Sequence, residues 1–401
     1  MLRLKTYLKT SALSLPLCVV LNFSPLPPLT TILYLARLGV FSELPKELVD
    51  PEELRAKGYA KEFVEIYREA VRAQRTGRRE GLRNLLEKRM RELRTSLDMM
   101  DYNVSTMMEV LSLTTIVVPL LLASVEVFMS PALFTPTIVA CSVLSVVVAL
   151  VMGIYTIPWE LWLRRPRLAT LAPMLVSIPA YFMTQDVAFS LTLGSVLSAP
   201  LVYLEQRRAV KVFDDALKYL SRATHSPNPV LAGIDLDDLL DKRFFGVARA
   251  AMVTLYVLFT QGGRRYFEGV TRLLAYVREY IVTLKGVRRK ALVSLFYTLV
   301  IAAAASASMA IIVATLAGIS SMAPSWTIGS IMPTASTTGD VADATLLFVA
   351  LSSISYAVAA ATMRDGNPLY FPLYLAAILP ISYTAYRLTL LYAPVMLGIK
   401  P

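Results

Sequence analysis

Long apolar runs decide what this chain can fold into. Seven stretches of about 17 to 30 residues are apolar almost throughout, and each is long enough to cross a hydrocarbon core about 30 Å thick. These runs cover residues 106–128, 137–158, 168–184, 187–204, 290–318, 343–362 and 369–386. Of the 401 residues, 56% are hydrophobic and only 17% are charged. The sequence therefore predicts an all-α, polytopic integral membrane protein with about seven transmembrane helices.

The basic residues fall on alternate sides of these runs. Of the 40 Lys and Arg residues, 34 lie in residues 1–105 and 205–290, whereas the loops at 129–136, 185–186 and 319–342 contain none. Lys and Arg mark the cytoplasmic side of a membrane protein, so we expect a multi-pass protein of the cell membrane with its N-terminus in the cytoplasm. The net charge of +11 then reflects topology, and we expect no nucleic-acid partner.

The same pattern divides the chain into four parts. Residues 1–105 are predicted to form an N-terminal segment and a first cytoplasmic helical bundle, and 106–204 four transmembrane helices. Residues 205–289 are predicted to form a second bundle, and 290–401 three more transmembrane helices. The last part includes an outer loop at 318–342 that is rich in Ser and Thr. A plain linker is the favoured interpretation of this loop, and contact with exported subunits is the alternative.

The N-terminal apolar region allows two interpretations. Residues 11–23 and 29–41 follow Lys5 and Lys9, which resembles a signal sequence. The Ser-Pro-Leu-Pro-Pro stretch at 24–28 splits the region, however, and a single crossing here would place the Arg-rich residues that follow outside the cell. We therefore expect a short re-entrant hairpin, or helices packed under the membrane face.

An internal repeat is the most informative feature of the sequence. Residues 30–105 and 215–290 align through short matching stretches in the same order, and chance similarity between basic helices is the less favoured explanation. The matching stretches are Tyr34-Leu35-Ala36-Arg37 with Tyr219-Leu220-Ser221-Arg222, Asp50-Pro51-Glu52-Glu53-Leu54 with Asp235-Leu236-Asp237-Asp238-Leu239, and Gly77-Arg78-Arg79 with Gly263-Arg264-Arg265. Both segments therefore predict small cytosolic helical bundles that continue into membrane spans.

Local chemistry supports these alignments. Asp50 and Asp235 precede further acidic residues and are predicted to cap helix starts, where free N–H groups and the helix dipole favour a carboxylate. Gly77 and Gly263 are predicted to end helices. The arginine pair that follows each glycine is either a solvated charge cluster or a contact for a partner. These pairs are Arg78, Arg79, Arg264 and Arg265.

Two cytoplasmic bundles, each leading into transmembrane helices, resemble the F-domain family of type II secretion and type IV pilus platform proteins. The similarity is greatest to archaeal pilus or archaellum platforms and extends over residues 29–396. The resemblance implies a non-enzymatic platform that couples a hexameric cytosolic ATPase to the insertion of pilin-like subunits from the lipid membrane. It makes the four arginines candidates for ATPase docking, and two fused units leave a homodimer open.

The sequence offers little chemistry to an enzyme. It contains no phosphate-binding Gly-x-x-x-x-Gly-Lys-Ser/Thr loop, and its sole His and two Cys residues suit neither a metal cluster nor a catalytic triad. We expect no catalytic residue, cofactor or metal. A secondary transporter with an internal repeat is the alternative function, and a membrane-bound lipid transferase comes third. Only four Gln and five Asn occur, which is compatible with a thermophilic source.

Several residues are predicted to lie at the membrane interface. An aromatic and basic belt at the inner leaflet is formed by Trp159, Trp162, Arg164, Arg165 and Arg167. Arg387, near the outer end of the last run, is interpreted as an interface anchor in preference to the partner of an acid. Glu109 lies near the start of the first run, so we expect its carboxylate to reach the interface.

Overall fold

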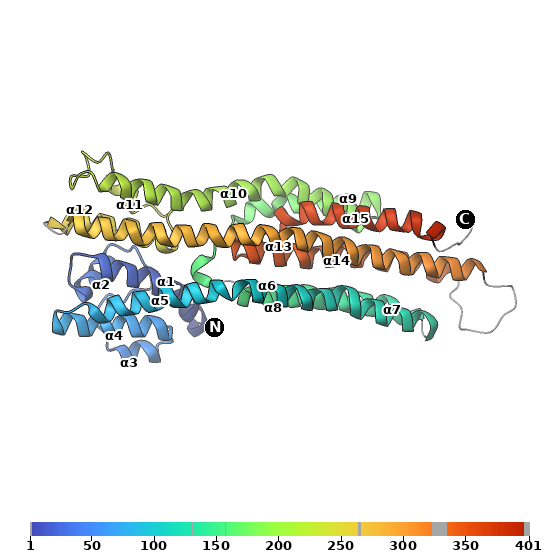
Figure 1. Ribbon diagram of the computed structural model, residues 1–401, viewed down its shortest axis with the longest axis horizontal. Coiled ribbons are helices and arrows are strands. Elements are labelled where there is room, and N and C mark those ends of the chain that lie inside the picture. Colours follow the sequence, from blue (N-terminus) through green and yellow to red (C-terminus); the bar gives the residue numbers. More distant parts are fainter. Residues whose placement is uncertain (1, 130, 157, 264–265, 323–334, 397–401) are drawn as a thin grey trace. The chain divides into compact units, whose positions relative to one another are not determined.

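The chain folds into helices that group into two compact units. The computed structural model describes residues 2–129, 131–156, 158–263, 266–322 and 335–396, and the regular elements in these ranges are all helices (Figure 1). Unit 1 comprises residues 1–98 and 208–286, and unit 2 comprises 99–207 and 287–401. The two segments that the sequence predicts as separate bundles fall in a single unit.

Unit 1 is built around its first helix. Its elements are α1 (Leu2–Phe23), α2 (Pro28–Arg37), α3 (Pro51–Ala56), α4 (Lys61–Thr76), α5 (Glu80–Asp98), the end of α10 (Val187–Ala223), α11 (Leu236–Leu239), α12 (Gly246–Gln261) and the first part of α13 (Tyr266–Met322). Helix α1 packs against α4, α5 and α12. The side chains of Leu17, Val19 and Leu21 are fully buried, as expected for a helix that is apolar all round. The second half of α1 therefore lies in the core of unit 1.

Two segments of unit 1 share the order of a short capped helix, a 16-residue helix and a glycine turn. The Asp50 side chain caps α3 by accepting a hydrogen bond from the backbone N–H of Glu52. The Asp235 side chain caps α11 in the same way, from the N–H of Asp237. Each short helix is followed by one of 16 residues, α4 or α12, and then by a glycine with positive φ. These glycines are Gly77 at φ 70° and Gly263 at φ 47°. A long helix follows in each half, α5 or α13.

Unit 2 contains the helices that are apolar and long enough to cross a membrane. Its elements are α6 (Met100–Ser112), the π-helical turn η1 (Leu113–Val117), α7 (Val118–Met129), α8 (Pro131–Thr156), η2 (Trp159–Leu161), the 3₁₀-helix η3 (Leu168–Val176), α9 (Ser177–Thr184), the start of α10, the rest of α13, α14 (Ala335–Asp365), η5 (Pro368–Tyr370) and α15 (Phe371–Met396). Within the described ranges, six helices qualify as membrane spans by length and composition. The predicted span at 168–184 is a shorter apolar helix made of η3 and α9. Within the predicted outer loop at 318–342, residues 323–334 lie outside the described residues, and the flanking residues belong to α13 and α14.

Helix α14 is the centre of unit 2. It packs against α8 and α15, and its buried face consists largely of Ala and Ser residues. Gly153 of α8 lies so close to α14 that a Cβ there would be 2.6 Å from the Thr362 hydroxyl oxygen. The Ser145 and Ser355 hydroxyls bond across the same interface at 2.7 Å. Lipid removes the hydrophobic driving force between membrane helices. Close packing and hydrogen bonds between hydroxyl groups therefore hold such helices together.

This packing predicts that Gly153→Ala destabilises the protein. The added methyl must displace Thr362 or separate the two helices, at a cost of about 1–3 kcal/mol. Thermal unfolding in detergent micelles measures the effect. The matched control is Gly286→Ala on α13, where an added methyl meets open space and helix propensity improves stability by up to about 1 kcal/mol. Equal transition temperatures for the two variants would show that α8 and α14 are not closely packed.

Candidate functional site

Unit 1 has a charged groove on its surface. The groove has a volume of about 1160 Å³ and lies between α5, the loop joining α1 to α2, and the first part of α13. It is lined by charges of both signs, namely Arg79, Arg83, Arg91, Arg94, Arg272, Glu80, Glu87, Glu268 and Glu279. Some of these form ion pairs across one helical turn, as Arg83 does with Glu87 at 3.0 Å. Exposed pairs of this kind exchange partners at little cost, so the groove suits reversible contact with another protein.

The structure separates the predicted arginine pair at the α4–α5 turn. Arg78 is exposed. Arg79 instead donates hydrogen bonds of 2.5 Å to the main-chain oxygens of Ser24 and Leu26, which holds the α1–α2 loop against the turn. Arg79 is therefore a structural residue, and Arg78 is the member of the pair that a partner can reach. Arg264 and Arg265, the pair of the second repeat, lie outside the described residues.

A buried carboxylate in unit 2 joins several helices. Asp365, at the end of α14, is fully buried and pairs with Arg288 of α13 at 3.0 Å. Its other oxygen accepts hydrogen bonds of 2.6 Å from Gln206 of α10 and from Tyr374 of α15. Its main-chain oxygen accepts from the N–H of Leu163 at 3.0 Å. A buried charge is stable only when it is paired and hydrogen-bonded, so this network fixes α10, α13 and α15 to the end of α14.

The predicted interface belt lies next to this network. Trp162 packs on Gly366, where a Cβ would be 2.5 Å from its ring, and this glycine has a φ of 69°. The main-chain oxygen of Arg164 accepts a hydrogen bond from the Tyr370 hydroxyl at 2.8 Å. The side chains of Arg164, Arg165 and Arg167 are exposed. Trp159 begins η2. The segment therefore makes specific protein contacts in addition to presenting basic side chains.

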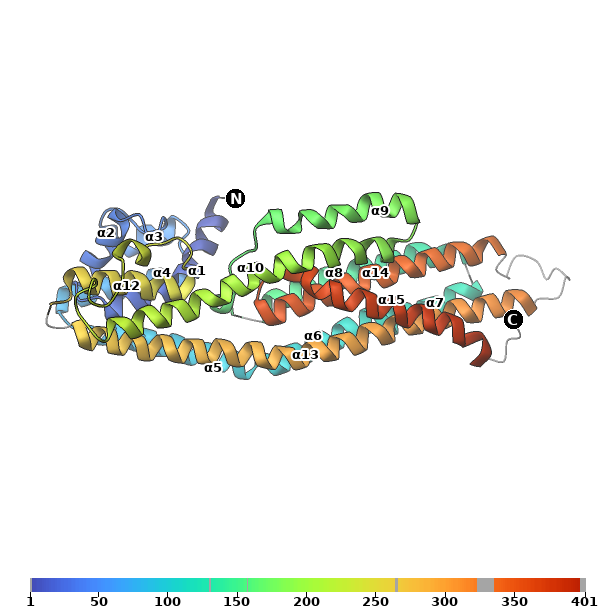
Figure 2. The same ribbon diagram turned by 90° about the horizontal axis from the view of Figure 1, so that it is seen from above.

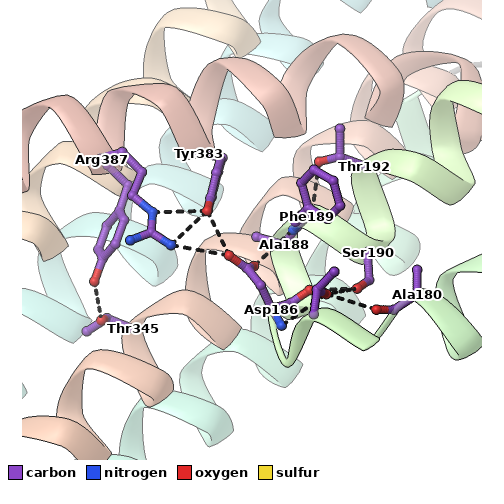
Figure 3. A network of polar contacts seen from close by, with 11 residues as sticks. Ala180, Asp186, Ala188, Phe189, Ser190, Thr192, Thr345, Tyr383 and Arg387 are labelled. Carbon is purple, nitrogen blue, oxygen red and sulfur yellow. Dashed lines mark hydrogen bonds and ion pairs between the residues drawn. The ribbon is translucent and has the colours of Figure 1, made fainter. Parts of the chain in front are cut away.

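A second ion pair joins α15 to the turn between α9 and α10. The Arg387 guanidinium lies 3.3 Å from an Asp186 oxygen, which also accepts a hydrogen bond of 2.7 Å from the Tyr383 hydroxyl. The other Asp186 oxygen caps α10 at the N–H of Phe189. Figure 3 shows Tyr383 and Arg387 reaching from α15 toward Asp186. Arg387 is half exposed and is paired with an acid. The sequence alone favours an interface anchor over this pairing.

Sequence reasoning missed the Asp365 network for a clear reason. Its members come from distant parts of the chain, and neither Gln206 nor Arg288 stands out from its polar neighbours. The one available signal was an acid and a glycine, Asp365 and Gly366, directly after a long apolar run. In the described part of the chain, no three His, Cys, Asp or Glu side chains lie together in a way that could hold a metal ion.

Comparison with known proteins identifies no family for this chain. No family model matches the chain, and neither a curated protein nor a solved structure matches it. The function therefore has to be inferred from the repeated element order, the polar networks and the grooves of the two units.

The Asp365–Arg288 pair should be strongly coupled. Asp365→Asn leaves the largely buried Arg288 without its counter-ion and is expected to cost about 3 kcal/mol of unfolding free energy. In an Arg288→Met background the same change should cost much less, giving a coupling above about 1 kcal/mol in a double-mutant cycle. The exposed pair of Lys285 and Asp214 is the control, with an expected coupling of about 0–1 kcal/mol. Additive effects at Asp365 and Arg288 would contradict the network.

Proposed function

We propose that this protein is the membrane platform of a type IV-pilus-like filament assembly or secretion machine. In this role it couples a hexameric cytosolic ATPase to the insertion of pilin-like subunits, and it catalyses no reaction itself. The observation that carries the proposal is the repeated element order in unit 1, in which each half continues into a candidate membrane span. Helix α5 is followed directly by α6, and α13 continues from unit 1 residues into unit 2 residues. This layout agrees with the resemblance to the F-domain platform family.

Two long helices provide a route for mechanical coupling. Helices α10 and α13 each contain residues of both units without a break. A helix transmits displacement along its axis because successive turns are hydrogen-bonded to one another. In α10 this ladder is interrupted at Pro200, which lies on the unit 2 side of Gln206. Gln206 and Arg288, which bind Asp365, lie at the positions where these helices change units.

A seventh crossing at 168–184 is part of the proposal. The segment has nine residues of 3₁₀-helix, which rise about 2.0 Å each, and eight residues of α-helix, which rise about 1.5 Å each. Its length is therefore about 30 Å, the thickness of the hydrocarbon core. Figure 2 shows α9 running back alongside α10, and Gly194 of α10 contacts Met174 of η3. With the N-terminus in the cytoplasm, seven crossings place the Asp186–Arg387 pair at the outer face.

Labelling with a membrane-impermeant maleimide tests this topology. Gln185→Cys should react in intact cells, whereas Arg78→Cys should react only after the membrane is opened. The native protein supplies the blank, because Cys18 and Cys141 are both buried. Burial also raises the pKa of the Cys18 thiol to about 12, so this group stays protonated and unreactive at neutral pH. Labelling of Arg78→Cys in intact cells would overturn the proposed orientation.

The docking proposal predicts the effect of removing three arginines. The Arg78→Ala/Arg264→Ala/Arg265→Ala variant should stay folded, because Arg79 still holds the α1–α2 loop. If each lost contact costs up to about 1 kcal/mol, ATPase affinity falls by up to about a hundredfold. Co-purification of the ATPase with the tagged protein measures recruitment, and electron microscopy counts surface filaments.

A matched triple variant separates docking from general loss of charge. Arg55→Ala/Lys61→Ala/Arg222→Ala removes the same charge from other exposed positions of unit 1 and should recruit ATPase normally. Normal recruitment by the first variant would move the docking surface elsewhere on unit 1. Solute flux through vesicles that contain the purified protein alone would instead favour the transporter alternative.

A further inference from the structure

A second groove lies within unit 2, between α6 and α13. Its volume is about 450 Å³. One wall is a polar stripe on α6 with residues about one helical turn apart, and the other wall is a mixed face of α13. The polar stripe consists of Asp101, Ser105, Glu109 and Ser112, and the facing residues of α13 include Lys290, Val293, Ser294 and Tyr297. A continuous polar stripe is unusual on a helix that qualifies as a membrane span.

Glu109 is the one charge in this groove that lacks a counter-ion. At the end of the groove, Asp101 pairs with Lys290 at 2.8 Å. Glu109 lies eight residues further along α6, about 12 Å deeper in the span. Its carboxylate accepts a hydrogen bond of 3.3 Å from Ser105, and it forms no ion pair with any residue that the structure describes. The candidate span begins at Met100, ahead of the apolar run at 106, so Glu109 is the tenth residue of that helix segment.

The groove beside Glu109 is of mixed polarity and open. Val293 and Tyr297 on the facing wall are 73% and 59% exposed, so the groove is open at the surface of unit 2. A carboxylate facing lipid is costly, and acids kept in such places generally have a functional partner. The π-helical turn η1 begins directly after Ser112, and single π-turns within α-helices occur often at functional sites.

We propose that this groove binds one edge of a partner transmembrane helix that presents a cation to Glu109. Val293 offers an apolar contact and the small serine side chains allow a helix to approach closely. The unpaired carboxylate selects a helix with a Lys, an Arg or an amine at the same level. The identity of the partner as a pilin-like subunit rests on the proposed function. The recognition chemistry, an apolar helix with one embedded cation, rests on the groove alone.

The test uses the full-length protein in phosphatidylcholine vesicles with two synthetic helices. Both helices have the same Leu/Ala sequence, and one carries a Lys where the other carries a Gln. A photo-crosslinking benzoylphenylalanine replaces Val293 in the groove wall. We expect half-maximal crosslinking of the Lys helix at about tenfold lower concentration than the Gln helix.

Two further variants assign this preference to Glu109. Glu109→Gln should remove the tenfold difference, and Asp343→Asn, which removes an exposed acid at the end of another span, should leave it unchanged. Equal crosslinking of the two helices, or a Lys preference that survives Glu109→Gln, would overturn the proposal. Loss of helix crosslinking on adding phosphatidylethanolamine would also overturn it in favour of a lipid amine. Crosslinks between two copies of the chain would overturn the proposal in favour of self-association.

This experiment contains neither ATPase nor filament subunit, so its outcome is independent of the proposed function. Binding of the Lys helix together with normal ATPase recruitment by the triple arginine variant would support the groove and reject the docking surface. The reverse result would reject the groove and leave the platform function standing.

Discussion

Close contact between helices, rather than apolarity, holds the membrane unit together. Lipid chains are as apolar as leucine side chains, so packing and hydroxyl bonds must provide the stability. Helix α14 meets this requirement with a buried surface of Ala, Ser and Thr, and Gly153 of α8 allows the backbones to approach. The position of α14 in turn fixes Asp365, which binds α10, α13 and α15. The polar network therefore depends on the packing of one helix.

Unit 1 is also organised around one helix, α1. Helix α1 supplies an apolar surface that α4, α5 and α12 cover. Both repeated halves contribute to this cover, since α4 belongs to the first and α12 to the second. A shared central helix explains why the halves form one unit and not two bundles. It also gives Arg79 its role, because the loop that it holds leads directly out of α1.

Features set by neighbouring residues could be predicted from the sequence, and features set by distant ones could not. Apolar runs gave most membrane spans, and Asp50 and Asp235 cap the helices expected of them because a cap acts on the next turn. The sequence left the place of α1 open, because an apolar helix segment looks the same in a protein core and in lipid. The Asp365 network and the role of Arg79 were missed because their partners are far away in sequence.

The most direct measurement of the platform function is filament assembly in cells that lack this protein. The account predicts that a deletion strain makes no surface filaments, retains its pilin-like subunits in the membrane and still contains folded, active ATPase. Restoring the gene should restore the filaments. A deletion strain that assembles filaments at the normal level would contradict the account.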